Sequence, residues 1–402
     1  MSAAARTPLA RLLNESDYVA RARAIASLIA DTARGVEADR RLSNKVVAAL
    51  HETGLFRLFL PSWLDGYEAA PSTFVQVIET VAQADASTAW CLCQMDVCSI
   101  ASVYLGRAGA EEIFARKGGA LAWGSTSNAR AVATEGGYRV SGDFEFGSGC
   151  HHATWLGGHC PVVDADGAPC LDQNGKQLER TVLFPKSAAS ITEVWNVIGL
   201  RGTGSDMYTL DELFVPQEQT ILALFQWPDA ERIELGGPYR FAANNIYAAG
   251  FAAVGLGNAR GALGDFLELA QRKMPRWGGR SLREDPLIQI AIAEADTKLA
   301  SACCYLVTTL HDAEEMACGR GPLSLDQRMK IRAAGTFALR AATQVVDHLY
   351  ELAGTTSIFT GNALERRFRD AHTVSQHLQG RISHFETVGK HMLGVETEAR
   401  FV

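Results

Sequence analysis

The sequence lacks several features that would place it in a specialised class. It has no run of about 18 apolar residues, so we expect no membrane-spanning helix. It has no long block of lysine and arginine, and its formal net charge is −7. Nucleic acid binding needs a basic face, and we therefore expect no nucleic acid partner. Residues 1–14 contain no continuous apolar segment, so we expect no cleaved secretory signal there.

Metal binding has little support as well. Cys91 and Cys93 are separated by one residue, which is not a zinc spacing, and no second ligand pair follows. His151 and His152 are adjacent, so on a strand they would point to opposite faces. We expect no metal site. The nine cysteines form an odd set, which indicates reduced, mostly buried thiols and a cytoplasmic protein.

The composition is that of an ordinary globular protein, and the residue pattern changes along the chain from helical to strand-like and back to helical. The chain has 402 residues, 47% of them apolar and 21% charged, which suits two or three packed domains. Apolar residues recur at helical spacing over 22–55, 74–84 and 86–104, with Gly54 as a stop signal. Short β-type runs then occupy 138–142, 181–185 and 210–215 between turn residues.

Helical periodicity returns near residue 239 and continues to the end of the chain. It predicts long helices over 240–274, 284–318, 323–353 and 363–393, which implies a four-helix bundle. We therefore predict a mainly α protein with a central β-domain. The expected domains are an N-terminal helical domain (1–117), a small antiparallel β-barrel or sandwich (118–235) and a C-terminal bundle (236–402).

The most informative segment is 195–206, which begins with Trp195 and contains Gly199-Leu-Arg-Gly-Thr-Gly-Ser205. A Gly-rich hairpin turn would explain the glycines alone. It would not explain the Trp, Arg, Thr, Ser and Asp residues gathered around them. The required Lys and Gly spacings of phosphate-binding and dinucleotide motifs are absent. We interpret the segment as a tight loop that presents several hydrogen-bond donors.

With this segment the sequence resembles the acyl-CoA dehydrogenase superfamily, and within it the two-component, reduced-flavin-dependent monooxygenases. The resemblance covers nearly the whole chain. The matching pieces, in order, are Gly54-Leu-Phe-Arg57, Asp85-Ala-Ser-Thr-Ala-Trp90, Gly136 to Gly142, Phe146-Gly-Ser-Gly-Cys150, Trp155, Trp195, Gly199 to Ser205, Val215-Pro216, Arg369-Asp370 and His377. Each piece is weak alone, whereas their order and spacing together are specific.

The resemblance implies a cofactor site for reduced FMN or FAD, with dioxygen as co-substrate. Phe146 and Ser148 would face the flavin ring, with the Ser148 hydroxyl near the N5–C4a edge, where it protects a C4a-hydroperoxide from losing hydrogen peroxide. Trp123 and Ser125 would line the ring through hydroxyls and backbone amides. The flavin phosphate would lie at Gly354, Thr355 and Thr356 and at Arg272 or Arg276; a solvated basic cluster remains an equal reading of the two arginines.

The resemblance also singles out His377 as a catalytic residue. Its neutral imidazole could deprotonate a phenol or donate a hydrogen bond to the hydroperoxide. On the predicted helix 363–393, His377 shares a face with His384 and His391 at heptad spacing, but not with His372. Expected substrate-pocket walls are Trp90, Met95, Trp155 and Phe359, although large apolar residues are more often plain core.

Two absences bear on the reaction. No Asp or Glu lies between Glu351 and Glu365, where many acyl-CoA dehydrogenases hold the base for α,β-dehydrogenation. This favours oxygenation, with a flavin dehydrogenase or oxidase as the alternative and a non-catalytic scaffold as a further one. No His lies between His51 and His151, where several phenol-hydroxylating relatives have one about two turns after the residue matching Trp90, so a non-phenolic ring stays open.

We therefore predict the oxygenase component of a two-component flavin monooxygenase. It would oxygenate a small aromatic or heteroaromatic substrate. A separate NAD(P)H:flavin reductase would supply the reduced flavin, and the resemblance implies a homotetramer formed through the bundle.

Overall fold

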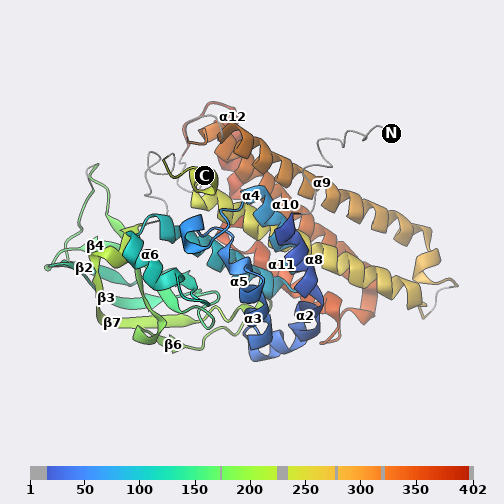
Figure 1. Ribbon diagram of the computed structural model, residues 1–402. Helices are drawn as coiled ribbons and strands as arrows, with labels where there is room; N and C mark the ends of the chain where they lie inside the picture. Colours follow the sequence, from blue (N-terminus) through green and yellow to red (C-terminus); the bar gives the residue numbers. More distant parts are fainter. Residues whose placement is uncertain (1–15, 173, 224–233, 277–278, 318–321, 398–402) are drawn as a thin grey trace, which may run out of the picture.

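The computed structural model describes residues 16–172, 174–223, 234–276, 279–317 and 322–397. The segment 1–14 and Cys318 lie outside these ranges. Figure 1 shows the strands gathered at one end of the molecule and the long helices α8, α9 and α10 at the other. The helices from the start of the chain lie between them, and α5 packs against α8 and against β1.

The N-terminal part is helical, as predicted, but it is divided more finely. Its helices are α2 (Asp17–Asp39), α3 (Asn44–Glu52), α4 (Pro71–Ala84), α5 (Ala86–Ser99) and α6 (Arg107–Phe114). The predicted helix over 22–55 is broken because Arg40 adopts a left-handed conformation with φ 52°. Ser43 then caps α3 by accepting a hydrogen bond from the Val46 amide. In α5 every residue except Gln94 is buried, which agrees with its uniformly apolar pattern.

The β region forms one mixed sheet. Its strands are β1 (Leu121–Gly124), β2 (Arg130–Thr134), β3 (Gly137–Phe144), β4 (Trp155–Val163), β5 (Glu179–Pro185), β6 (Ser190–Thr192), β7 (Met207–Pro216) and β8 (Thr220–Leu222). The order is β6-β7-β3-β2-β4-β5-β8, with β1 beside β4.

The expectation of a purely antiparallel β-domain is wrong in one respect, because β4 runs parallel to both β1 and β2. A parallel pair needs a long connection. The chain supplies it with the β2–β3 hairpin and the segment 145–154, which bring it back to the starting edge before β4 begins.

The C-terminal helices are α8 (Ala243–Arg272), α9 (Pro286–Ala317), α10 (Leu325–Ala353), α11 (Ala363–Ser375) and α12 (Ser383–Met392). The first three predicted bundle helices are confirmed. The fourth, over 363–393, is wrong because α11 ends at Ser375 and a short turn, η11 (Leu378–Gly380), precedes α12. At Gly380 a Cβ atom would overlap the side chain of Leu339 on α10. A residue larger than glycine here would require the Leu339 side chain to move.

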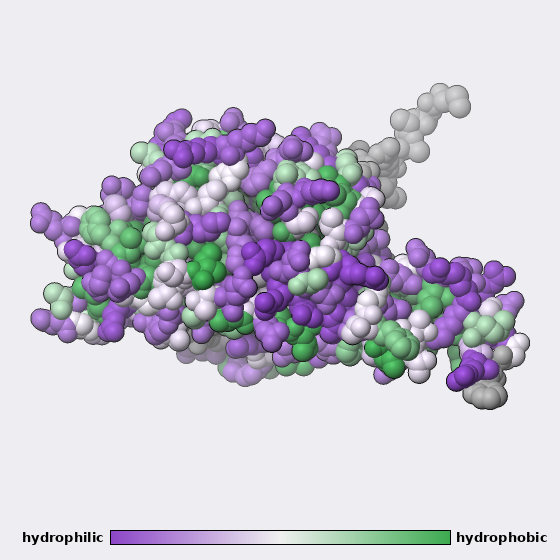
Figure 2. Space-filling view, turned by 90° about the horizontal axis from the view of Figure 1, so that it is seen from below, coloured by the Kyte–Doolittle hydropathy of each residue, from purple (hydrophilic) through white to green (hydrophobic). Residues whose placement is uncertain are grey.

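A single large cluster of buried apolar residues extends through all three regions. The domain boundaries at 117/118 and 235/236 stay a prediction. None of the described helices is long and apolar enough to cross a membrane. Polar residues cover most of the face seen in Figure 2, and apolar residues form several separate groups on it.

Candidate active site

A cavity of about 490 Å³ lies where the sheet meets the helices, a volume typical of small-molecule sites. Its walls come from α5, β1, β4, the loops 146–148 and 195–205, the first three turns of α8, the end of α11 and the turn after it. The lining residues are mostly aromatic or uncharged polar: Trp90, Gln94, Trp123, Gly124, Ser125, Phe146, Ser148, His159, Trp195, Leu200, Ser205, Asn244, Tyr247, Phe251, Thr373, Gln376, His377, Leu378, Gln379 and Arg381.

Stacked rings form one wall of the cavity. Trp90 on α5 stacks on Phe251 of α8 with ring centroids 4.0 Å apart. Tyr247, one turn earlier on α8, stacks on Phe251 at 5.5 Å. The imidazole of His377 meets the edge of Trp90 at 5.2 Å and lies 4.5 Å from Phe251. Such a wall offers flat apolar contact to a planar ligand.

A chain of hydroxyl groups begins beside this wall. The Trp90 indole N–H donates to Ser148 Oγ at 3.0 Å. Ser148 Oγ lies 2.7 Å from Ser205 Oγ, and Ser205 Oγ lies 2.7 Å from Thr203 Oγ1. Thr203 in turn donates to the Leu200 carbonyl at 2.9 Å. These residues join α5 to the two loops that face it.

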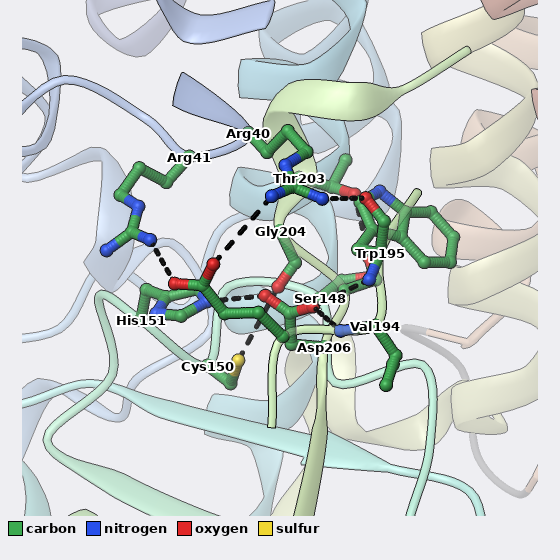
Figure 3. A network of polar contacts seen from close by, with 12 residues as sticks. Arg40, Arg41, Ser148, Cys150, His151, Val194, Trp195, Thr203, Gly204 and Asp206 are labelled. Atoms are coloured by element: carbon green, nitrogen blue, oxygen red, sulfur yellow. Dashed lines mark hydrogen bonds and ion pairs between the residues drawn. The ribbon is translucent and has the colours of Figure 1, made fainter. Parts of the chain in front are cut away.

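Asp206 anchors the loop that contains Trp195 (Figure 3). Its Oδ1 accepts the backbone amides of Val194 and Trp195 at 2.7 and 2.8 Å, and its Oδ2 lies 2.7 Å from His151 Nε2. Burial alone would raise the pKa of Asp206, but these hydrogen bonds outweigh burial and hold the pKa below its usual value. The prediction of a tight loop holds, although its donors are mainly engaged within the protein.

Asp370 anchors the same loop from α11. Its carboxylate accepts the Leu200 amide at 2.6 Å, and Leu200 has a positive φ of 51°. Burial raises the pKa of Asp370 to about 7, and the nearby Asp85 acts in the same direction. The Arg369-Asp370 pair therefore has a clear local role: Asp370 fixes the backbone of the loop that lines the cavity.

His377 occupies the turn between α11 and η11. Its Nδ1 accepts the backbone N–H of Gln379 at 3.3 Å and so caps η11. Burial, reinforced by Arg332 and Arg381, lowers the pKa of His377 to about 4. The ring is therefore neutral near pH 7. Because Nδ1 is the acceptor, the proton is on Nε2.

The cavity lining contains no Asp or Glu among the residues that the structure describes. The second lining histidine, His159, hydrogen-bonds Thr181 at 2.7 Å, and burial lowers its pKa to about 4. Within this described lining, Arg381 is the one charged residue. The site therefore offers neutral donors and acceptors rather than a carboxylate base.

Several predicted site residues come together in this cavity. Trp90, Trp123, Ser125, Phe146, Ser148 and His377 all line it. The backbone amides near Trp123 are not available, however. The Gly124 N–H donates to the Tyr208 hydroxyl and the Ser125 N–H to the Glu145 carbonyl.

Three predicted pocket walls lie elsewhere. Met95 is buried, with its sulfur against Gly149. Trp155 is buried at the start of β4, where it pairs with Leu121 and Pro185. Phe359 is 67% exposed in the connection before α11. None of the three is among the lining residues.

The predicted phosphate residues lie at the far end of α8. Arg272 ends this helix, about 25 residues or roughly 40 Å from Tyr247. The neighbour that contacts the turn at 354–356 is Lys273, which donates to the Ala353 carbonyl at 2.5 Å and to Thr356 Oγ1 at 2.7 Å. Gly354, Thr355 and Thr356 thus belong to a separate polar cluster, outside the cavity of this chain, and Arg272 and Arg276 do not line that cavity either.

The sequence did not indicate the contribution of α8. Asn244, Tyr247 and Phe251 follow one another at spacings of three and four residues, which places them on one helical face. That spacing was the available signal. On α5, Gln94 is one turn after Trp90 and lines the cavity.

The histidines and cysteines near residue 150 have separate partners. His151 and His152 lie in a turn rather than on a strand, and His152 Nε2 accepts the Leu42 amide at 3.1 Å. Within the described ranges, no group of three or more His, Cys, Asp or Glu side chains could hold a metal ion. Eight cysteines in these ranges are free, six of them buried, as the sequence predicted.

Comparison with known proteins adds three kinds of match. The family model "Acyl-CoA dehydrogenase, C-terminal domain" matches residues 249–381. The oxygenase subunit HsaA of a flavin-dependent monooxygenase from Rhodococcus jostii (strain RHA1) is 29% identical over 88% of this chain and 92% of its own length. The oxygenase component of an FADH2-dependent resorcinol hydroxylase from Rhizobium sp. is 27% identical over 95% of both chains.

Over most of its length this chain is similar to oxygenase components of flavin-dependent monooxygenases.

The fold agrees with that similarity. The structure of XiaF from Streptomyces sp. in complex with FADH2 and glycerol superimposes with a TM-score of 0.87, at 24% identity, over 94% of this chain and 95% of that one. FMN-bound TdsC from Paenibacillus sp. superimposes with a TM-score of 0.78, at 19% identity, over 96% of this chain. The predicted acyl-CoA dehydrogenase-like architecture of this monooxygenase component is confirmed, and an oxygenase component implies a separate flavin reductase.

Proposed function

We propose that this monooxygenase component binds a reduced flavin in the cavity and oxygenates a small aromatic or heteroaromatic compound held against the stacked rings. One observation carries the proposal: an aromatic cavity of about 490 Å³ whose described lining has hydroxyl, amide and imidazole groups but no carboxylate. A dehydrogenase needs a base for a carbon-bound proton, and the lining offers none. The alternative of a flavin dehydrogenase or oxidase is therefore disfavoured.

The lining suits the flat ring system of a flavin. Phe146, at a positive φ of 56° and 62% exposed, lies edge-on to Trp195 at the mouth of the cavity. It would contact one face of the ring, with Ser148 at its reacting edge and Trp123 and Ser125 beside it. A bound reduced flavin would supply the activated oxygen atom. The residues of this chain would hold the ring and exclude water.

For His377 the hydrogen bonding favours one of the two predicted roles. Acting as a base at Nε2 would require the proton to move to Nδ1, which already accepts the Gln379 amide. The low pKa, about 4, also makes it a weak base. We propose that His377 donates from Nε2, either to a substrate oxygen or to the oxygen that is being transferred. Gln94 on α5 would offer a further amide group to the ligand.

The cofactor is reduced FMN or FAD, since the resorcinol hydroxylase relative is named FADH2-dependent, the XiaF structure holds FADH2 and the TdsC structure holds FMN. The remaining expectations are an NAD(P)H-dependent reductase, a homotetramer and a cytoplasmic location. The phosphate role of Arg272, Arg276 and 354–356 is now proposed only for the cofactor of a second copy, because these residues lie too far from the cavity of their own chain.

Anaerobic mixing with reduced flavin tests the proposal. The protein is combined with reduced FMN or reduced FAD, dioxygen is added with and without an aromatic candidate such as resorcinol or indole, and flavin absorbance, hydrogen peroxide and product are followed. We expect flavin oxidation to be delayed relative to free flavin, and an oxygenated product with a suitable ring. Oxidation at the rate of free flavin, with stoichiometric peroxide, would refute the proposal. Reduction of bound oxidised flavin by an acyl thioester would establish the dehydrogenase alternative instead, and absence of flavin binding would indicate a non-catalytic scaffold.

A further inference from the structure

We infer that a one-way chain of hydrogen bonds holds the Ser148 hydroxyl as an acceptor toward the cavity, and that Thr203, which does not line the cavity, thereby makes the site select reduced over oxidised flavin. The inference rests on the proposed function, because it concerns the cofactor of the same cavity. Its new element is the positioning role of Thr203 and Ser205.

The direction of the chain is fixed at Thr203. A carbonyl oxygen can only accept, so the contact of 2.9 Å between Thr203 Oγ1 and the Leu200 carbonyl consumes the Thr203 proton. Further hydrogen bonds hold this peptide in place. Leu200 is tied through its amide to Asp370, and its carbonyl also accepts the Trp195 indole N–H at 3.0 Å.

Every other hydroxyl must then follow the same direction. Thr203 has only acceptor capacity left, so the 2.7 Å contact with Ser205 requires Ser205 to donate. Ser205 has one proton, so the 2.7 Å contact with Ser148 requires Ser148 to donate. The Trp90 indole N–H, which can only donate, fills one Ser148 lone pair at 3.0 Å. The directions agree at every step.

Ser148 is left with one lone pair and no proton to offer. Its own amide N–H is used as well, since it donates to the Phe146 carbonyl at 2.8 Å. The neighbouring amides of Gly124 and Ser125 are also engaged. A ligand atom that meets the Ser148 hydroxyl must therefore be a donor.

The two redox forms of flavin differ in this respect at N5. Reduced flavin carries N5–H, which can donate to the remaining lone pair of Ser148. Oxidised flavin has an unprotonated N5, which would face another acceptor. Leaving buried acceptors unpaired or opposed weakens binding by roughly 10- to 100-fold. The hydroxyl chain would therefore favour the reduced form by about that factor.

Two substitutions test the inference in the full-length protein. Reduced and oxidised FMN and FAD are titrated under anaerobic conditions, and the ratio of the two dissociation constants is determined. Thr203→Val removes the acceptor of the Ser205 proton, so Ser205 can turn toward Ser148 and release the Ser148 proton to the ligand. We expect the preference for reduced flavin to fall by roughly 10-fold. Thr203→Ser keeps the hydroxyl and should retain the wild-type ratio.

Ser205→Ala gives a second measurement and stands in if Thr203→Val does not fold. It too leaves the Ser148 proton free, so the ratio should fall in the same direction. An unchanged ratio in a folded variant overturns the inference, and so does an equal loss of affinity for both redox forms, which would indicate a purely structural role. Failure of the wild-type protein to bind either form would instead refute the proposed function.

Discussion

Replacing His377 by Asn and by Gln separates its two contacts. Asn is a good capping residue, and its Oδ1 can accept the Gln379 amide, but its side chain is too short to donate from the position of Nε2. Gln can place an N–H near that position but gives up the cap. In His377 both functions are present, because Nδ1 accepts the Gln379 amide at 3.3 Å and Nε2 carries the proton.

The size of each effect follows from the contact that is lost. A hydrogen bond to a charged or developing anionic oxygen contributes about 1.5–3 kcal/mol, so His377→Asn should lower product formation roughly 10- to 150-fold. Its free energy of unfolding should stay within about 0.5 kcal/mol of wild type. His377→Gln should keep much of the product yield but lose about 1 kcal/mol of stability with the cap. His377→Ala should lower both product formation and the free energy of unfolding, while flavin binding changes less than product formation.

The assay combines single-turnover product yield per reduced flavin with urea unfolding and flavin titration, for all three variants at the same pH. If Asn preserved the yield and Gln abolished it, the imidazole would act through the cap alone. With a pKa of about 4, His377 is neutral throughout the range from pH 5.5 to 8, so the wild-type yield should not titrate with the ordinary histidine pKa of about 6.5. A yield that did titrate near 6.5 would also contradict the reasoning. Equal loss of yield and flavin affinity in Ala would remove the donor role.

Three further predictions concern stability. Burial lowers the pKa of His159 and His377 to about 4, so their contribution is complete above pH 6.5 and is lost as the pH falls toward 4, by roughly 3 kcal/mol each at most; urea unfolding at pH 7.5 and 4.5 measures this, and greater stability at the lower pH would contradict it. Asp370 has its pKa raised to about 7, so it destabilises the fold as the pH rises from about 4 to 7; Asp370→Asn should gain roughly 2–3 kcal/mol relative to wild type between pH 5 and 8, and a pH-independent difference would exclude this. Gly264 on α8 has open space where an added methyl group would lie, whereas at Gly158 that group would overlap a phenylalanine ring; Gly264→Ala should raise the free energy of unfolding by up to about 1 kcal/mol and Gly158→Ala should lower it, as thermal melting would show.

The sequence was sufficient to predict most helices and part of the cavity lining. Apolar periodicity located α4, α5, α8, α9 and α10, because their buried faces repeat at helical spacing. The break after α11 could not be found this way. The spacing of apolar residues around His377 resembles a helix, but the chain instead forms η11, which the His377 side chain caps.

Some residues of the site could likewise be predicted from the sequence, and others could not. Ser148, Phe146 and His377 followed from the family resemblance, and all of them line the cavity. Tyr247 and Phe251 were missed because α8 is buried nearly all round, so periodicity does not reveal which of its faces borders a cavity. The polar contacts of 354–356 fall to Lys273 rather than Arg272, since a shift of one residue along a helix end cannot be resolved from spacing alone.

One helix sets the geometry of both sides of the cavity. α11 carries Asp370, whose carboxylate grips the Leu200 peptide, and it ends just before His377, about two turns or roughly 10 Å further along. Sliding of α11 along its axis would move the hydroxyl-bearing loop and the imidazole together, so that the two could not drift apart independently. A ligand could displace either wall only by moving the whole of α11. Mutations that loosen the packing of α11 on α10 or α8 would therefore disturb both walls at once.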